Sequence, residues 1–144
     1  MRTGERETLD CMYVDVTDSE TYRGVLEAEI RRHASRLVEL VIVEDIARWA
    51  ASRKGNAKGN PPAISVVDGT TGQWGIVLRR SIDADWIGSI LSRVELGGFP
   101  QTRAVLNTPE IFLRHLVLHE LAHLENGWGQ EDEENCDAWA FERL

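Results

Sequence analysis

The sequence contains only two cysteines, Cys11 and Cys136, among its 144 residues. Two cysteines exclude a disulfide scaffold and a four-cysteine zinc site, and they are typical of a protein in a reducing cytoplasm. No apolar run approaches the ~18 residues that a bilayer-spanning helix requires. The charged N-terminus has no apolar stretch behind it, so it does not resemble a secretory signal. We therefore expect a cytoplasmic protein that makes no membrane contact.

Positive charge is scarce in the last part of the chain. From Glu120 onward eight residues are acidic and only Arg143 is basic, while the whole chain carries a net charge of −8. This distribution lacks the basic patch by which proteins hold nucleic-acid phosphates. Direct nucleic-acid binding is therefore not expected. The acidic segment is either a solvated surface or a cation-binding region, and charge alone does not choose between them.

Composition and length predict one globular domain over residues 1–144. Hydrophobic residues make up 42% of the chain and charged residues 28%, as in soluble globular proteins. A chain of this length can bury a core without disulfide bonds. The sequence has no internal repeat that would indicate a second unit.

The first 50 residues contain patterns typical of a strand and patterns typical of a helix. Residues 9–16 are typical of a short strand. Thr17 and Glu20 form a capping box, and apolar residues at helical spacing follow it to about residue 50. A helix of that length is unusual in a small domain. Residues 37–43 also have high β propensity, so either a break or a strand is expected there.

The rest of the chain predicts a hairpin and three helices. The hairpin strands are expected at residues 64–67 and 74–78, and the helices at residues 86–94, 108–126 and 131–144. Thr108 and Pro109 are a favourable helix start, and Gly127 is a favourable stop. We expect an α+β domain in which a small antiparallel or mixed sheet lies beside these helices.

The strongest motif is His119-Glu120-Leu121-Ala122-His123. Residues four apart lie on one face of a helix, so both imidazoles can reach one zinc ion. Glu120 lies about 100° round the helix from His119, where it can accept a proton from water without binding the metal. Two histidines also occur at this spacing by chance, as ordinary core or surface residues. The surrounding helix and a third ligand candidate favour the metal site.

A third zinc ligand is expected on the last helix. Its first turn is acidic, with candidates Glu131, Asp132, Glu133 and Glu134. Acidic residues also favour a helix N-terminus through the helix dipole alone. Glu133 lies one turn before Asp137, so it can bind the metal while Asp137 accepts a hydrogen bond from a ligand histidine. This relation favours Glu133, with Glu134 next.

The two motifs together resemble those of the ImmA/IrrE-type metallopeptidases, whose second motif reads Glu-x-x-Ala-Asp-x-Phe-Ala. Aligning its Asp with Asp137 and its last Ala with Ala140 places the family's ligand glutamate on Glu133. The sequence departs from the pattern at Cys136, where Ala is usual, and at Trp139, where Phe is usual. The resemblance covers roughly the last 35 residues. It implies proteolysis of a regulatory protein, typically a transcriptional repressor.

These features predict a zinc-dependent endopeptidase in which His119, His123 and Glu133 hold Zn²⁺ and Glu120 is the catalytic base. Its substrate would be a protein or peptide. Minimal soluble M48-type gluzincin peptidases carry a similar Glu-x-x-x-Asp helix, so a peptidase with another substrate is one alternative. The other alternative is a non-catalytic, zinc-stabilised protein-interaction module, whose site a fourth protein ligand would close.

Smaller signals surround the motif. His115, one turn before His119, is expected to be a packed or partly exposed helical residue, although it could also donate a hydrogen bond near the metal or bind substrate. Cys136 is expected to be a small buried hydrophobe. The predicted hairpin is the candidate surface for aligning a substrate strand. The group that would stabilise the oxyanion stays open between Tyr13, Tyr22, His115 and Arg103.

Overall fold

The computed structural model describes residues 16–53 and 60–144. Its three strands are β1 (Val38–Val43), β2 (Ala63–Val67) and β3 (Trp74–Arg79). Its α-helices are α2 (Arg23–His33), α3 (Ile46–Ser52), α4 (Ala84–Leu96), α5 (Thr102–Val105), α6 (Pro109–Asn126) and α7 (Glu133–Glu142). Two 3-10 turns, η1 (Ser19–Tyr22) and η2 (Gln130–Asp132), precede α2 and α7. The predicted α+β class is therefore confirmed. None of the helices in these ranges has the length and apolar character to cross a membrane.

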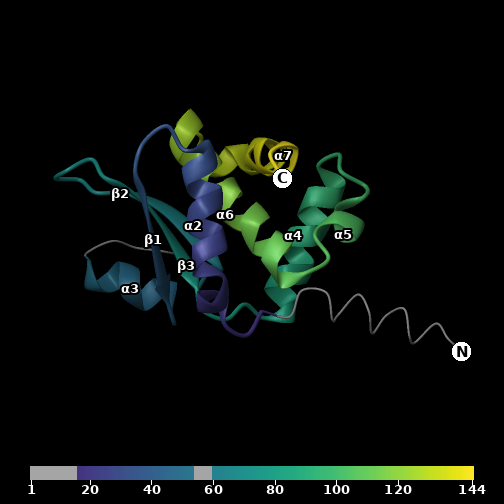
Figure 1. Ribbon diagram of the computed structural model, residues 1–144, viewed down its shortest axis with the longest axis horizontal. Helices are drawn as coiled ribbons and strands as arrows, with labels where there is room; N and C mark the ends of the chain where they lie inside the picture. The colour runs from purple at the N-terminus through teal and green to yellow at the C-terminus, as the bar shows by residue number, and fades with distance from the viewer. Residues whose placement is uncertain (1–15, 54–59) are drawn as a thin grey trace, which may run out of the picture.

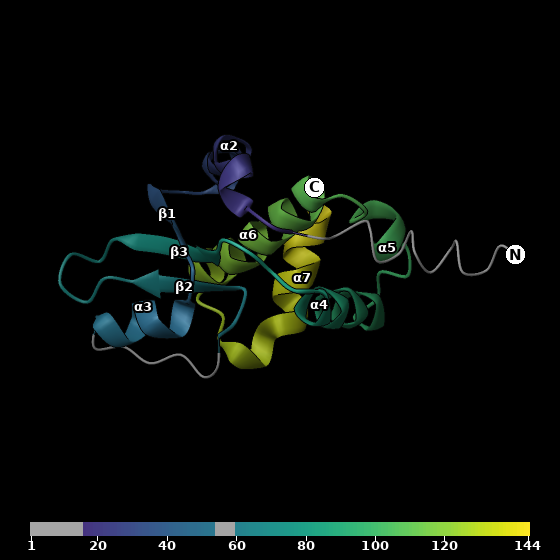
Figure 2. The ribbon, with the colours of Figure 1, turned by 90° about the horizontal axis from the view of Figure 1, so that it is seen from below.

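Helix α6 lies in the middle of the molecule, with the sheet towards one end and α4 and α5 towards the other (Figure 1, Figure 2). It contacts α2, β2, β3 and α7, and α7 in turn contacts α4. Most residues of α6 from Phe112 to Ala122 are buried. A helix that is buried nearly all round has neighbours on every face. Side chains at the C-terminal end of this buried stretch therefore pack against several helices and strands at once.

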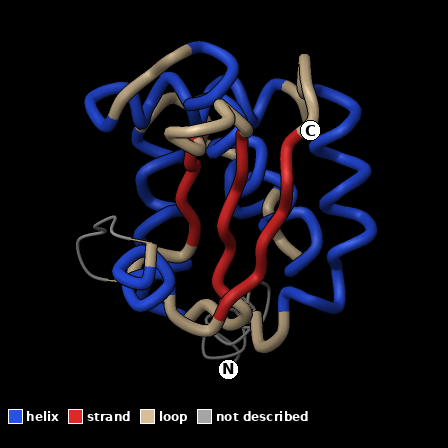
Figure 3. Tube along the Cα trace, turned by 90° about the vertical axis from the view of Figure 1, so that its left-hand side faces the viewer, coloured by secondary structure: helices blue, strands red, loops and turns tan. Residues whose placement is uncertain are grey.

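The sheet is small and mixed. Its strand order is β1-β3-β2, with β1 parallel and β2 antiparallel to the central strand β3 (Figure 3). The predicted hairpin is thus confirmed as β2 and β3. In its turn, the Asp68 carboxylate accepts hydrogen bonds from the backbone N–H groups of Thr70 and Thr71, both at 2.8 Å. Gly72 follows with a φ of 76°, a left-handed conformation that glycine adopts without steric cost.

The helical pattern that runs to about residue 50 is interrupted, as its unusual length indicated. Helix α2 ends at His33, and Ala34 has an extended backbone. Residues 38–43 then form strand β1, the alternative that their β propensity also indicated. Valine and isoleucine dominate this segment, and such β-branched residues fit a pleated, half-buried surface better than a helix. Pairing with β3 therefore makes residues 38–43 a strand and not a continuation of the helix.

The start of the first helical region also differs from the expectation. The Asp18 side chain, and not Thr17, caps η1 by accepting a hydrogen bond from the Glu20 N–H at 3.1 Å. The strand predicted at residues 9–16 lies outside the described residues except for Val16. Val16 pairs with Ile82 in an isolated bridge.

A buried ion pair joins α2 to α6. Glu29 is 2% exposed, and its carboxylate accepts hydrogen bonds from Arg114 at 2.9 Å and from Arg32 at 3.3 Å. A buried carboxylate without such partners would be strongly unfavourable. The pairing therefore fixes the face that α2 presents to α6.

The two ends of α6 follow the sequence prediction. Thr108 is the N-cap, and its hydroxyl accepts a hydrogen bond from the Ile111 N–H at 3.3 Å, with Pro109 in the first turn. At the other end Gly127 has a φ of 65°, and its N–H donates to the His123 carbonyl. This left-handed residue ends the helix and turns the chain back towards α7.

Replacing Thr108 by alanine should lower the free energy of unfolding by about 1 kcal/mol, because a helix N–H loses its acceptor. Thermal unfolding followed by circular dichroism would show this as a midpoint lower by roughly 4 °C. The matched variant Thr108→Ser keeps the hydroxyl and should unfold near the wild-type temperature. Equal losses in both variants would mean that the threonine methyl group, and not the cap, stabilises this helix end.

Candidate metal centre

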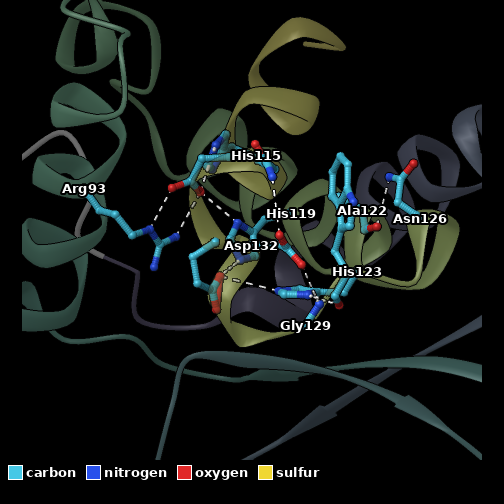
Figure 4. Close-up of polar contacts among 12 residues, drawn as sticks. Arg93, His115, His119, Ala122, His123, Asn126, Gly129 and Asp132 are labelled. Carbon is cyan, nitrogen blue, oxygen red and sulfur yellow. Dashed lines mark hydrogen bonds and ion pairs between the residues drawn. The ribbon is translucent and has the colours of Figure 1, made fainter.

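The last turns of α6 and the first turns of α7 face each other because the chain reverses tightly between them. After Gly127, the Trp128 N–H donates to the His123 carbonyl at 3.2 Å. The Gly129 N–H then donates to the Asp132 carboxylate at 3.1 Å, which starts η2. Figure 4 shows the result, with His119 and His123 of α6 beside the reversal. Residues from both helices therefore share one small space.

The His119 ring is held at both nitrogens. It is 2% exposed, its Nδ1 lies 2.7 Å from the Asp137 carboxylate, and its Nε2 lies 2.5 Å from Glu133 Oε2. Burial alone lowers the pKa of His119, but the two carboxylates outweigh burial and raise it to about 9. Since Asp137 holds Nδ1, the Nε2 atom is directed towards Glu133.

His123 is oriented in a different way. Its Nδ1 donates to the backbone carbonyl of Trp128 at 2.9 Å, so Nε2 is again the nitrogen that faces the shared space. This Nε2 lies 3.5 Å from Glu133 Oε2. The Cys136 thiol and the Glu133 carboxylate raise the pKa of His123. A single carboxylate oxygen thus lies near the Nε2 atoms of both histidines.

The structure adds Cys136 to this cluster. Cys136 is fully buried, and its Sγ and one ring nitrogen each of His119 and His123 all lie within 4.8 Å of one another. Imidazole nitrogen and thiolate sulfur are both common metal ligands, so this group can hold a metal ion. From the sequence, Cys136 was expected to be a small buried apolar residue. Cys136 lies three residues after Glu133 and hence on nearly the same helix face. This spacing is the sequence feature that could have indicated that Cys136 belongs to the site.

Asp137 connects the cluster to α4. It is 2% exposed and accepts two hydrogen bonds from Arg93, from Nε at 2.7 Å and from Nη2 at 2.9 Å (Figure 4). Burial tends to raise the pKa of Asp137, but hydrogen bonds from His119 and Arg93 lower it below the usual range. Arg93 has no motif around it, and only the fold brings it to Asp137.

Glu120 is buried at 8% exposure beside the two histidines. Burial raises the pKa of its carboxyl group, and positive charge on His119 and His123 opposes that rise. A carboxylate in such surroundings is a stronger base than an exposed one. The position next to the cluster and the raised pKa are the properties that a proton acceptor needs.

The other predicted residues have different surroundings. His115 is fully buried, as expected for a packed helical residue, and burial lowers its pKa to about 4. Its Nε2 lies 3.8 Å from Asp137. Glu134 is exposed, while Asp132 accepts the Gly129 N–H in the reversal.

Three of the four open candidates for an oxyanion-binding group can be placed, and one of them is the buried His115. Arg103 pairs with Glu95 at 3.1 Å. Tyr22 packs against the hydrophobic core. Tyr13 lies outside the described residues.

No protein-family model, curated protein or solved structure matches this chain.

Replacing Arg93 by alanine should destabilise the fold, because Asp137 would stay buried without the two hydrogen bonds that Arg93 donates. Hydrogen bonds to charged groups are each worth about 1.5–3 kcal/mol, so we expect a loss of about 2–3 kcal/mol in urea unfolding. The matched control Arg103→Ala removes a half-buried ion pair whose carboxylate, Glu95, is 30% exposed and so stays hydrated. This variant should cost less than about 1 kcal/mol. Similar losses in the two variants would contradict a special role for the Arg93–Asp137 pair.

Proposed function

We propose that this protein is a zinc-dependent endopeptidase in which His119, His123 and Glu133 hold the ion. The observation that supports this proposal is the convergence of three donor atoms. Glu133 Oε2 lies 2.5 Å from His119 Nε2 and 3.5 Å from His123 Nε2. Two imidazoles and one carboxylate are a typical protein ligand set for catalytic zinc.

The surroundings of the three donors also fit a metal site. Ligand histidines usually donate their second ring N–H to a carboxylate or a backbone carbonyl, which fixes the ring and its tautomer. Here Asp137 and the Trp128 carbonyl take these two positions. Both Nε2 atoms are therefore left to face Glu133.

When bound, zinc supplies Lewis-acid activation of water and of a peptide carbonyl. Glu120 then accepts the proton of the attacking water, because it is buried beside the histidines without being one of the proposed ligands. The same carboxyl group passes the proton to the leaving amine. Asp137 and Arg93 hold His119 in place throughout, so they are positioning residues.

Strand β2 is the surface on which we place the substrate. Within residues 16–53 and 60–144 it is an edge strand, because only one of its sides pairs with another strand, β3. It also packs against α6. An extended peptide can add to such an edge through backbone hydrogen bonds. The resemblance to ImmA/IrrE-type peptidases favours a regulatory protein, such as a transcriptional repressor, as the source of that peptide. A minimal M48-type peptidase would use the same site with another substrate.

A non-catalytic, zinc-stabilised interaction module is the second candidate. The proximity of Cys136 to both histidines favours it, because a fourth protein donor is typical of structural zinc sites. Glu120 argues for the peptidase, since a structural site has no need of a buried base beside it.

The Glu133→Ala variant tests the ligand assignment. It should lower zinc affinity by more than the roughly 10–100-fold that loss of an outer hydrogen-bond partner costs. Chelator competition with the purified protein measures this affinity. Glu134→Ala, which removes the neighbouring exposed carboxylate, is the matched control and should bind zinc like the wild type. If Glu134→Ala is the weaker binder, the carboxylate ligand has been assigned to the wrong residue.

The Glu120→Gln variant separates the enzyme from the interaction module. It keeps the shape of the side chain but cannot accept a proton, so zinc content should be unchanged while cleavage falls by about 10²–10⁴-fold. Glu110→Gln, on an exposed position of α6, serves as the control.

The assay for Glu120→Gln incubates each protein with lysate of the native host and compares newly formed peptide N-termini. Fragments that form with the wild type and Glu110→Gln, but not with Glu120→Gln, support the peptidase. A partner that all three proteins bind and none cleaves supports the interaction module.

A further inference from the structure

Cys136 has polar neighbours that are unusual for a buried structural cysteine. It belongs to α7, three residues after Glu133 and directly before Asp137, and it is 0% exposed. A free cysteine in a protein core normally packs as a small apolar residue. Here one ring nitrogen each of His119 and His123 lies within 4.8 Å of its sulfur. Packing alone does not explain a thiol among these groups.

The position of the sulfur matches that of a metal ligand. Cys136 Sγ lies within 4.8 Å of a ring nitrogen of His119 and of His123. Donor atoms that share a tetrahedral zinc ion at ordinary bond lengths lie roughly 3.5 Å apart. A small closing movement of side chains therefore brings the sulfur to bonding distance.

We propose that Cys136 provides a thiolate as a fourth ligand and thereby closes the metal site in its resting state. This inference rests on the metal site of the proposed function but not on peptidase activity. Three protein ligands leave one position of a tetrahedral zinc ion for water, whereas four leave none. The Cys136 thiol loses its proton to solvent when its sulfur binds the ion. The resting centre is therefore thiolate-inhibited, and water gains access only when the sulfur is displaced.

Cobalt substitution tests the ligand directly. Co²⁺ occupies zinc sites, and a bound thiolate gives a sulfur-to-cobalt charge-transfer band in the near ultraviolet. The wild-type protein loaded with one equivalent of Co²⁺ should show this band, and Cys136→Ala should lose it. Cys11→Ser removes the other thiol of the sequence and should leave the band in place.

The outcomes of the cobalt experiment are distinct. A wild-type protein that binds Co²⁺, as its visible d–d bands report, but shows no sulfur band overturns the inference and leaves the proposed zinc site intact. A protein that binds no Co²⁺ overturns both. The wild-type spectrum alone decides whether a thiolate binds the metal ion. The result therefore does not depend on whether Cys136→Ala folds.

Azide tests whether the thiolate closes the site. Azide is a small anion that binds an open coordination position of Co²⁺ and shifts its visible spectrum. Titration should shift the spectrum of the Cys136→Ala protein and leave that of the wild type unchanged. Equal shifts in the two proteins would show an open position in the wild type and would overturn the closed resting state.

Discussion

The arrangement of the site depends on the contacts that the Asp137 carboxylate makes. This carboxylate lies on α7, accepts two hydrogen bonds from Arg93 of α4 and is 2.7 Å from Nδ1 of His119 on α6. A buried carboxylate is tolerated only when it is paired with good geometry. These contacts therefore fix three helices and one imidazole ring together. A displacement of α4 or α7 would change the direction of the His119 Nε2 atom.

The two histidines depend on different parts of the structure. His119 is held by Asp137, which comes from a neighbouring helix and is itself held by Arg93. His123 is held by the carbonyl of Trp128, only five residues further along the chain. The first ring thus needs the packed tertiary structure, whereas the second needs only the turn at Gly127. A perturbation of the helix packing should act on the candidate metal centre mainly through His119.

The sequence predicted the features that depend on local patterns. Thr108 and Gly127 mark the ends of α6 through capping chemistry, and the turn at Gly72 joins the predicted hairpin. The one-turn relation of Glu133 to Asp137 indicated which acidic residue faces the histidines.

Strand β1 was only one of two alternatives, because its conformation is decided by pairing with β3 and not by its own periodicity. Arg93 was missed because it meets Asp137 through a contact between helices, which spacing along one helix does not show. Cys136 was missed although its spacing from Glu133 was available, because a buried cysteine is usually an apolar core residue.

The balance of charge around His119 and His123 fits the proposed metal ion. Glu120, Glu133 and Asp137 bring three carboxylates together, and Arg93 contributes one permanent positive charge. Two further positive charges are needed to neutralise the group. Without a metal ion the rings of His119 and His123 can supply them as protons, which agrees with the raised pKa values of both. A divalent ion would bring the same two charges and use the neutral rings as ligands, releasing their protons. The thiolate proposed for Cys136 would add one further negative charge, which strengthens the attraction for the cation. The acidic C-terminal segment, whose role was ambiguous in the sequence, thus provides part of this site. The site carries excess negative charge unless it binds protons or a metal ion.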